Sequence, residues 1–170
     1  MRYYIDTEFI EDGVTVDLIS IGVVAEDGRE FYAESADVDL TRASDWVKAN
    51  VVPHLTGVDD DDASQVLPRS EIAERLREFI GAGRPEFWSW CSAYDWVALC
   101  QLYGMMMDKP ASWPSYCADI QQEMDRLGLE DGDVPAHPGT AHDALADAHW
   151  HRAIHEFLRR AEAAPAQVAG

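Results

Sequence analysis

The stretch that decides the fold is residues 3–35, which read YYIDTEFIEDGVTVDLISIGVVAEDGREFYAES. Three segments rich in aromatic and β-branched residues, 3–9, 14–25 and 29–35, alternate there with two Glu-Asp-Gly turn signals. Aromatic and β-branched residues favour strands, and short connections that contain Asp-Gly join antiparallel neighbours. We therefore predict a three-stranded antiparallel meander at the start of the chain.

Beyond the meander, apolar residues recur at helical spacing. Ser70 is predicted to cap a helix that buries Ile72, Leu76 and Ile80 and stops at Gly81. The order of elements predicts an α/β fold with a mixed sheet, in which parallel strands extend the antiparallel meander and helices flank it. Further helices are predicted over residues 41–51, 94–103 and 143–163 and up to Leu127, further strands over residues 86–91 and 116–118, and loops over residues 52–68 and 128–140.

Size and composition limit the function classes. The 170 residues, 47% of them hydrophobic, suffice for one domain, which we place at residues 1–163 before a frayed tail at 164–170. Three cysteines without a C-x-x-C pair argue against a disulfide framework, and no apolar run is long enough to cross a bilayer. We expect a cytoplasmic protein without a membrane partner. The formal net charge of −19 argues, at first sight, against nucleic acid as a partner.

Four carboxylates occupy positions where hydrophobic residues are expected. Asp6 and Glu8 stand two residues apart in the first strand, so they point to the same face and either raise each other's pKa or require a cation. A solvated strand face would also account for them, although a strand with apolar neighbours is usually central. Asp95 and Asp147 lie on the apolar faces of their predicted helices, although Asp95 also suits a helix N-cap.

His142 stands just before the last helix, for which Asp143 is the predicted N-cap. Positions five apart point about 140° apart on an ideal helix, so we place His142 on the preceding loop, where it can reach a site that Asp147 helps to form. Four inward acids from three elements predict an oxygen-rich site for Mg²⁺ or Mn²⁺, and such clusters commonly hold two ions for phosphoryl displacement. A nearby histidine suits deprotonation of the attacking water, although a lone histidine is otherwise an ordinary surface residue.

Three short motifs resemble those of the DEDDh 3′–5′ exonucleases, which have the ribonuclease H-like fold. They are residues 6–8 (Asp-Thr-Glu), residues 94–95 (Tyr-Asp) and residues 142–147 (His-Asp-Ala-Leu-Ala-Asp). The likeness is closest to the polyadenylate-specific 3′-exoribonuclease AS family and runs through residues 4–13, 18–32, 93–104 and 142–148. Cys91 stands where the wider family often has Asn, which favours the narrower subgroup.

The resemblance implies a metal-dependent 3′–5′ exoribonuclease that releases nucleoside 5′-monophosphates from the 3′ end of single-stranded RNA. It also implies a preference for adenylate tails and a homodimer. The four acids would hold two Mg²⁺ ions, for which Mn²⁺ can substitute, and His142 would be the general base. Glu8 would lie near the terminal ribose and Phe9 would stack on the last base. With Tyr94 and Trp96, which flank Asp95 and are predicted at the rim, the substrate-binding residues are Asp6, Thr7, Glu8, Phe9, Tyr94, Trp96 and His142.

Other residues are interpreted as structural, and two other functions stay open. Trp88 or Trp90 is predicted to lie in the core. His151 and His155 have the spacing of a zinc pair but lack a third ligand, so a solvated helix face is the favoured interpretation.

A DNA 3′–5′ exonuclease or proofreading module would use the same metal site. A non-catalytic RNA- or nucleotide-binding module is the other alternative, against which the four acids and His142 argue.

Overall fold

The computed structural model describes residues 1–56, 63–139 and 141–163 of the chain. The acidic run at residues 59–62, predicted as loop, and the predicted tail at residues 164–170 lie outside the described residues. Among the helices that are described, none is both long and apolar enough to cross a membrane.

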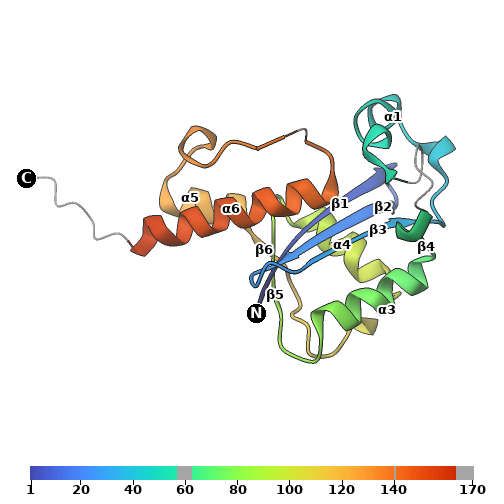
Figure 1. Cartoon of the computed structure of the whole chain (residues 1–170), viewed down its shortest axis with the longest axis horizontal. Coiled ribbons are helices and arrows are strands. Elements are labelled where there is room, and N and C mark those ends of the chain that lie inside the picture. Colours follow the sequence, from blue (N-terminus) through green and yellow to red (C-terminus); the bar gives the residue numbers. More distant parts are fainter. Residues whose placement is uncertain (57–62, 140, 164–170) are drawn as a thin grey trace, which may run out of the picture.

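A six-stranded sheet forms the centre of the fold (Figure 1). Its strands are β1 (Arg2–Glu11), β2 (Val16–Ala25), β3 (Glu30–Ser35), β4 (Val66–Leu67), β5 (Glu86–Ser89) and β6 (Ala118–Asp119), in the order β4-β3-β2-β1-β5-β6. The pairs β1–β2 and β2–β3 are antiparallel, which confirms the predicted meander. The pairs β1–β5, β5–β6 and β3–β4 are parallel, so parallel strands extend the meander on both sides. β1 is therefore a central strand.

Helices cover both faces of this sheet (Figure 1). They are α1 (Asp45–Asn50), α3 (Arg69–Ile80), α4 (Ala93–Gln101), α5 (Ile120–Leu127) and α6 (Ala144–Ala163). Residues of α3 and α4 share one core cluster with Tyr3 and Ile5 of β1. Along the other face runs α6, with α5 beside it, and Tyr4 of β1 reaches His155 of α6 there. Because side chains alternate along a strand, Asp6 and Glu8 lie on the same face as Tyr4, under α6.

The start of α6 lies directly on β2 at Gly22. A Cβ atom at this position would lie 2.2 Å from the carbonyl oxygen of Ala144, the first residue of α6. No side chain larger than hydrogen fits at such a separation, so Gly22 permits the close contact between helix and strand. The contact matters for the site because His142 and Asp147 flank this end of α6.

Several predicted boundaries differ from the structure. α3 begins at Arg69, so Ser70 is not its cap; the Arg69 N–H instead donates to Asp37 at 2.8 Å, which satisfies a donor of the first turn. α1 begins only at Asp45, because the Ser44 hydroxyl accepts from the Val47 N–H and caps the helix there. β4 lies within residues 52–68, which were predicted as a loop. Gly81, with φ +78°, ends α3 as predicted.

Candidate active site

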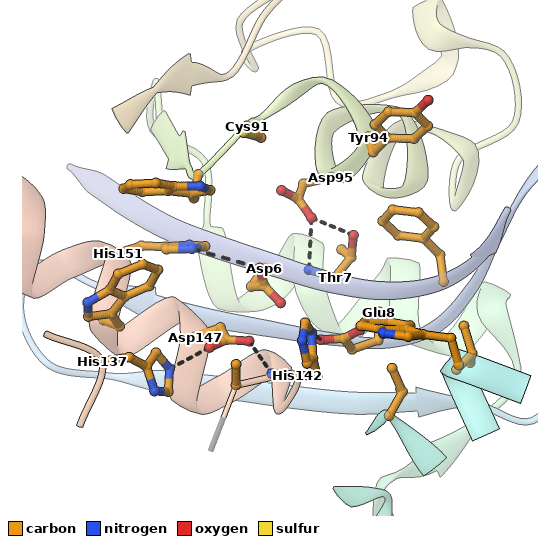
Figure 2. Close-up of a pocket in the computed structure, with 17 residues that line it drawn as sticks. Asp6, Thr7, Glu8, Cys91, Tyr94, Asp95, His137, His142, Asp147 and His151 are labelled. Carbon is orange, nitrogen blue, oxygen red and sulfur yellow. Dashed lines mark hydrogen bonds and ion pairs between the residues drawn. The ribbon is translucent and has the colours of Figure 1, made fainter. Parts of the chain in front are cut away.

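A pocket of about 430 Å³ opens over β1, between the first turns of α4 and α6 (Figure 2). Every residue predicted to bind metal or substrate lines it except Trp96. These lining residues are Asp6, Thr7, Glu8, Phe9, Tyr94, Asp95, His142 and Asp147. Residues as far apart in the sequence as Asp6 and Asp147 therefore meet in one cavity.

Asp6 and Glu8 form the floor of the pocket on the central strand. Burial raises the pKa of Asp6 well above its ordinary value, and the negative charges of Asp95 and Glu8 raise it further. Burial likewise raises the pKa of Glu8 to about 8, with Asp147 and Asp95 adding to the effect. The charged forms of both carboxylates are thus unfavourable in the protein alone, and a cation among them would relieve the repulsion.

Asp95 enters the pocket from the first turn of α4 and is tied to two strands. Its Oδ1 accepts hydrogen bonds from the Thr7 N–H at 2.9 Å and the Thr7 hydroxyl at 2.7 Å, and its Oδ2 accepts from the Ser89 hydroxyl. Ser92 occupies the N-cap position of α4, so the N-cap alternative for Asp95 is wrong. Burial raises the pKa of Asp95 to about 6, while these hydrogen bonds oppose the rise.

Asp147 and His142 meet at the start of α6. Asp143 caps this helix as predicted, since its Oδ1 accepts from the N–H groups of Leu145 and Ala146, both at 3.0 Å. The His142 N–H donates to Asp147 Oδ2 at 2.8 Å, and His142 has a φ of +74°, which turns the loop back over the pocket. His142 therefore lies on the preceding loop, as predicted.

The imidazole of His142 faces the carboxylates from this loop (Figure 2). Its Nδ1 lies 3.9 Å from Glu8 Oε1, and ligand atoms of Glu8, His142 and Asp147 all lie within 4.8 Å of one another. The ring also packs edge-on against Trp46 of α1, with 4.8 Å between ring centroids. Carboxylate oxygens and an imidazole nitrogen this close together are suitable donors for a divalent cation.

Trp96 is a correction to the predicted site. Successive residues on a helix point about 100° apart, so Tyr94, Asp95 and Trp96 do not all face one pocket. Tyr94 is half exposed at the rim and stacks on Phe9, with 5.5 Å between ring centroids and planes 11° apart. Trp96 is buried on the opposite side, against Phe87 in the core.

His151 and His155 are a second correction. Both were interpreted as a solvated helix face, but their exposed fractions are 2% and 4%, and His151 lines the pocket. The helical spacing could have found His151, because it lies four residues after Asp147 and therefore on the same face of α6. The buried His155 packs under Trp88, with 3.9 Å between ring centroids. Trp88 and Trp90 are partly buried and pack against the cluster around α5 and α6, and Trp90 also lines the pocket.

Sequence reasoning also missed residues that only the fold brings to the pocket. His137, on the loop before α6, lies 2.5 Å from Asp147 Oδ1 through its Nε2. No local pattern marks such loop and helix residues, because their proximity arises from chain segments that pack together. The remaining lining residues of this kind are Trp46, Val47, Val51, Cys91, Ala141 and Trp150.

Comparison with known proteins finds a matching family and similar relatives. Residues 1–158 match the family described as the 3′-5′ exoribonuclease Rv2179c-like domain. The 3′-5′ exoribonucleases Rv2179c and MT2234.1, from two strains of Mycobacterium tuberculosis, are each 47% identical to the chain over 152 residues, which cover 87% of both chains.

Solved structures support the fold. S. pombe Pop2p, in its Mg²⁺- and Mn²⁺-bound form, superposes with a TM-score of 0.54 at 15% identity and covers 93% of this chain and 82% of its own. A structure of exonuclease I gives a TM-score of 0.60 at 11% identity over 94% of this chain and 40% of its own. The mixed sheet flanked by helices is thus the ribonuclease H-like α/β fold that was predicted.

Proposed function

Because this chain belongs to the family of the 3′-5′ exoribonuclease Rv2179c-like domain, we propose that its pocket shortens single-stranded RNA from the 3′ end by metal-dependent hydrolysis. The chain is an enzyme of the 3′-5′ exoribonuclease class, as its family and its 47% identical relatives are. The observation that carries the finer proposal is the convergence of four acids, of which Glu8, Asp95 and Asp147 are buried, and His142 in one cavity.

The acids Asp6, Glu8, Asp95 and Asp147 fit two divalent cations, Mg²⁺ or Mn²⁺. Burial raises the pKa of Asp6 and Glu8, and the neighbouring negative charges raise it further, a repulsion that bound cations would relieve. Pop2p, which shares the fold, has been solved with both ions bound. When two such ions are bound, they supply charge neutralisation on the phosphodiester and a more acidic water molecule.

His142 is the proposed general base. Its side chain is 40% exposed, so the ring is open to the pocket, where its Nδ1 lies near Glu8. The backbone hydrogen bond to Asp147 and the contact with Trp46 hold the ring above the carboxylates. From this place the imidazole can accept a proton from a water that attacks the terminal phosphodiester. The bond from phosphorus to the 3′ oxygen of the preceding nucleotide breaks, that oxygen is protonated, and a nucleoside 5′-monophosphate is released.

The stacked pair of Phe9 and Tyr94 forms an aromatic wall at the rim, suited to the terminal bases of a single strand. Glu8, beside Phe9, is suited to contact the terminal ribose. Following the resemblance to the DEDDh enzymes and to the ribonuclease AS family, we propose a preference for adenylate tails. Assembly as a homodimer and a cytoplasmic location stay predictions, which light scattering and cell fractionation would test.

A comparison of RNA and DNA substrates tests the proposal. Oligo(A) RNA, the other RNA homopolymers and oligo(dA) are incubated with and without Mg²⁺, and the products are separated. We expect Mg²⁺-dependent release of 5′-AMP, fastest from oligo(A) RNA. Faster degradation of DNA would favour a proofreading-type module, and binding without hydrolysis would favour a non-catalytic module.

Two variants connect that activity to the pocket. Asp6→Ala and His142→Ala should each lower kcat by at least about 10²-fold, since each removes a group from the reacting site. Asp6→Ala should also weaken Mg²⁺ binding. Thr15→Ala, in the exposed turn between β1 and β2, is the control and should leave activity unchanged. Full activity in both pocket variants would contradict the assignment of the site.

A further inference from the structure

His151 of α6 is buried beside the pocket, and one edge of its ring faces Asp6 (Figure 2). Its Nδ1 lies 2.9 Å from the carbonyl oxygen of Ile5. Because a carbonyl oxygen can only accept a hydrogen bond, Nδ1 carries a proton. In the neutral ring the lone pair is therefore on Nε2, the nitrogen that faces the pocket.

The Nε2 atom has a carboxylate beside it but no hydrogen bond within the described part of the chain. Its distance to Asp6 Oδ1 is 3.8 Å, which is too long for a hydrogen bond. Two ligands of one cation, each about 2.1 Å from it, lie at most about 4.2 Å apart. The separation is therefore compatible with one cation held between Asp6 and His151.

The surroundings of the ring match those of metal-bound histidines. Such histidines usually donate their other ring N–H to a carbonyl or carboxylate, which fixes the tautomer and the orientation of the ring. His151 does so through Ile5 of the central strand. Trp150 packs against the ring, with 5.8 Å between centroids, and Trp90 packs in turn on Trp150. The imidazole is thus held in place before any cation arrives.

We propose that Nε2 of His151 is a nitrogen ligand for the cation that Asp6 holds. The inference rests on the metal-dependent function proposed above and refines it. A nitrogen ligand increases the affinity for Mn²⁺ more than that for Mg²⁺, which binds preferentially to oxygen. The site of this chain should therefore prefer Mn²⁺ more strongly than a site made of carboxylates alone.

Two substitutions separate a ligand from a structural histidine. His151→Asn places an amide N–H near the position of Nδ1, so the bond to Ile5 is kept while the nitrogen facing Asp6 is removed. His151→Gln places an amide oxygen near the position of Nε2 and exchanges the nitrogen ligand for oxygen. His155→Asn is the matched control, because His155 lies one turn later on α6, is equally buried and bonds Tyr4 outside the pocket.

Calorimetric titration of the metal-free proteins with Mn²⁺ and with Mg²⁺ gives the first readout. In His151→Asn we expect the dissociation constant for Mn²⁺ to rise at least about tenfold and that for Mg²⁺ to rise much less. His151→Gln should still bind both ions but lose the preference for Mn²⁺, while His155→Asn should match the wild type. Unchanged Mn²⁺ affinity in His151→Asn, or an unchanged preference in His151→Gln, would overturn the proposal.

Pulsed electron paramagnetic resonance of bound Mn²⁺ gives the second readout, because it detects nitrogen coordinated to the ion. The spectra are recorded in a His142→Gln background, since His142 is another imidazole near these carboxylates. We expect the nitrogen signal to fall with His151→Asn and to persist with His155→Asn. A signal that His151→Asn leaves unchanged would refute the ligand. If the proposed metal-dependent function itself were wrong, the result would differ from these outcomes, because the wild type and Asp6→Ala would bind Mn²⁺ equally.

Discussion

At the scale of single residues, Thr7 shows how a short side chain holds a carboxylate of the pocket in place. Its backbone N–H and its hydroxyl both donate to the same oxygen of Asp95, in a buried environment. Hydrogen bonds to a charged group contribute about 1.5–3 kcal/mol, more than those between neutral groups. The position of Asp95 therefore depends on a residue of β1 and not only on its own helix.

Thr7→Val removes the hydroxyl while keeping the β-branched shape. We expect the free energy of unfolding to fall by about 1–3 kcal/mol and kcat to fall, because Asp95 loses one of its hydrogen bonds. Thr15→Val is the control, since Thr15 makes the same kind of bond to Asp12 in an exposed turn. Urea denaturation of both variants gives the comparison, and equal losses would contradict the role given to Thr7.

Glu8 makes the stability of the metal-free protein depend on pH. Burial raises its pKa to about 8 from the ordinary 4.5, so between these values the folded state keeps a proton that the unfolded state has lost. The stability contributed by protonated Glu8 is therefore fully present below the lower value and is lost as the pH rises through the higher one. We expect the free energy of unfolding, measured in EDTA, to fall over this range.

Glu8→Gln provides the comparison, because an amide does not ionise. Its free energy of unfolding should fall less over the same pH range, and added Mg²⁺ should stabilise the wild type more at pH 8 than at pH 5. A decline as steep in Glu8→Gln as in the wild type would show that other groups cause the pH dependence.

For single residues, the sequence predicts the direction of a side chain where that direction follows from local periodicity. Asp6 and Glu8 alternate with buried residues of β1, and Asp147 lies on the apolar face of α6, so their inward direction follows from spacing. The prediction for Trp96 is wrong because neighbours in a helical sequence do not share a face: one helical step turns a side chain by about 100°.

At the scale of elements, the contact between β2 and α6 sets where His142 and Asp147 lie. Gly22→Ala would place a methyl group within 2.2 Å of the Ala144 carbonyl oxygen, so the start of α6 must move away. We expect a loss of at least about 1–3 kcal/mol in unfolding free energy and a loss of activity. Gly83→Ala, where nothing lies within 4 Å, is the control and should leave both unchanged. Full activity in Gly22→Ala would contradict this account.

The elements that the sequence predicts well are those with a long apolar pattern. The three meander strands and α6 are of this kind. β4 was missed because its two residues are too few to show alternation, and it exists only through pairing with β3. The start of α3 differs by two residues from the prediction, because a carboxylate from a distant loop, Asp37, supplies the hydrogen bond that a local cap normally supplies.

At the scale of the whole molecule, the net charge of −19 restricts how RNA is held. Two divalent cations would bring it only to −15, so the protein stays strongly acidic. Among the described residues that line the pocket, none is Lys or Arg. Several arginines elsewhere, including Arg42, Arg69 and Arg126, are paired with carboxylates. The charge therefore argues against a long basic groove. It is compatible with binding of a few terminal nucleotides through cations and stacking.

This picture predicts a shallow dependence of RNA binding on salt. Each phosphate neutralised by a basic side chain on a single strand adds about 0.7 to the slope of log K against log salt. With few such contacts, the slope should stay below about 2 in magnitude. Fluorescence anisotropy of oligo(A) RNA with the His142→Ala variant, at fixed Mg²⁺ and varied KCl, measures it without hydrolysis. Because only terminal nucleotides are held, lengthening the RNA on its 5′ side should barely change the affinity. A slope of about 4 or more, with affinity rising steadily with length, would instead require a basic track along the surface.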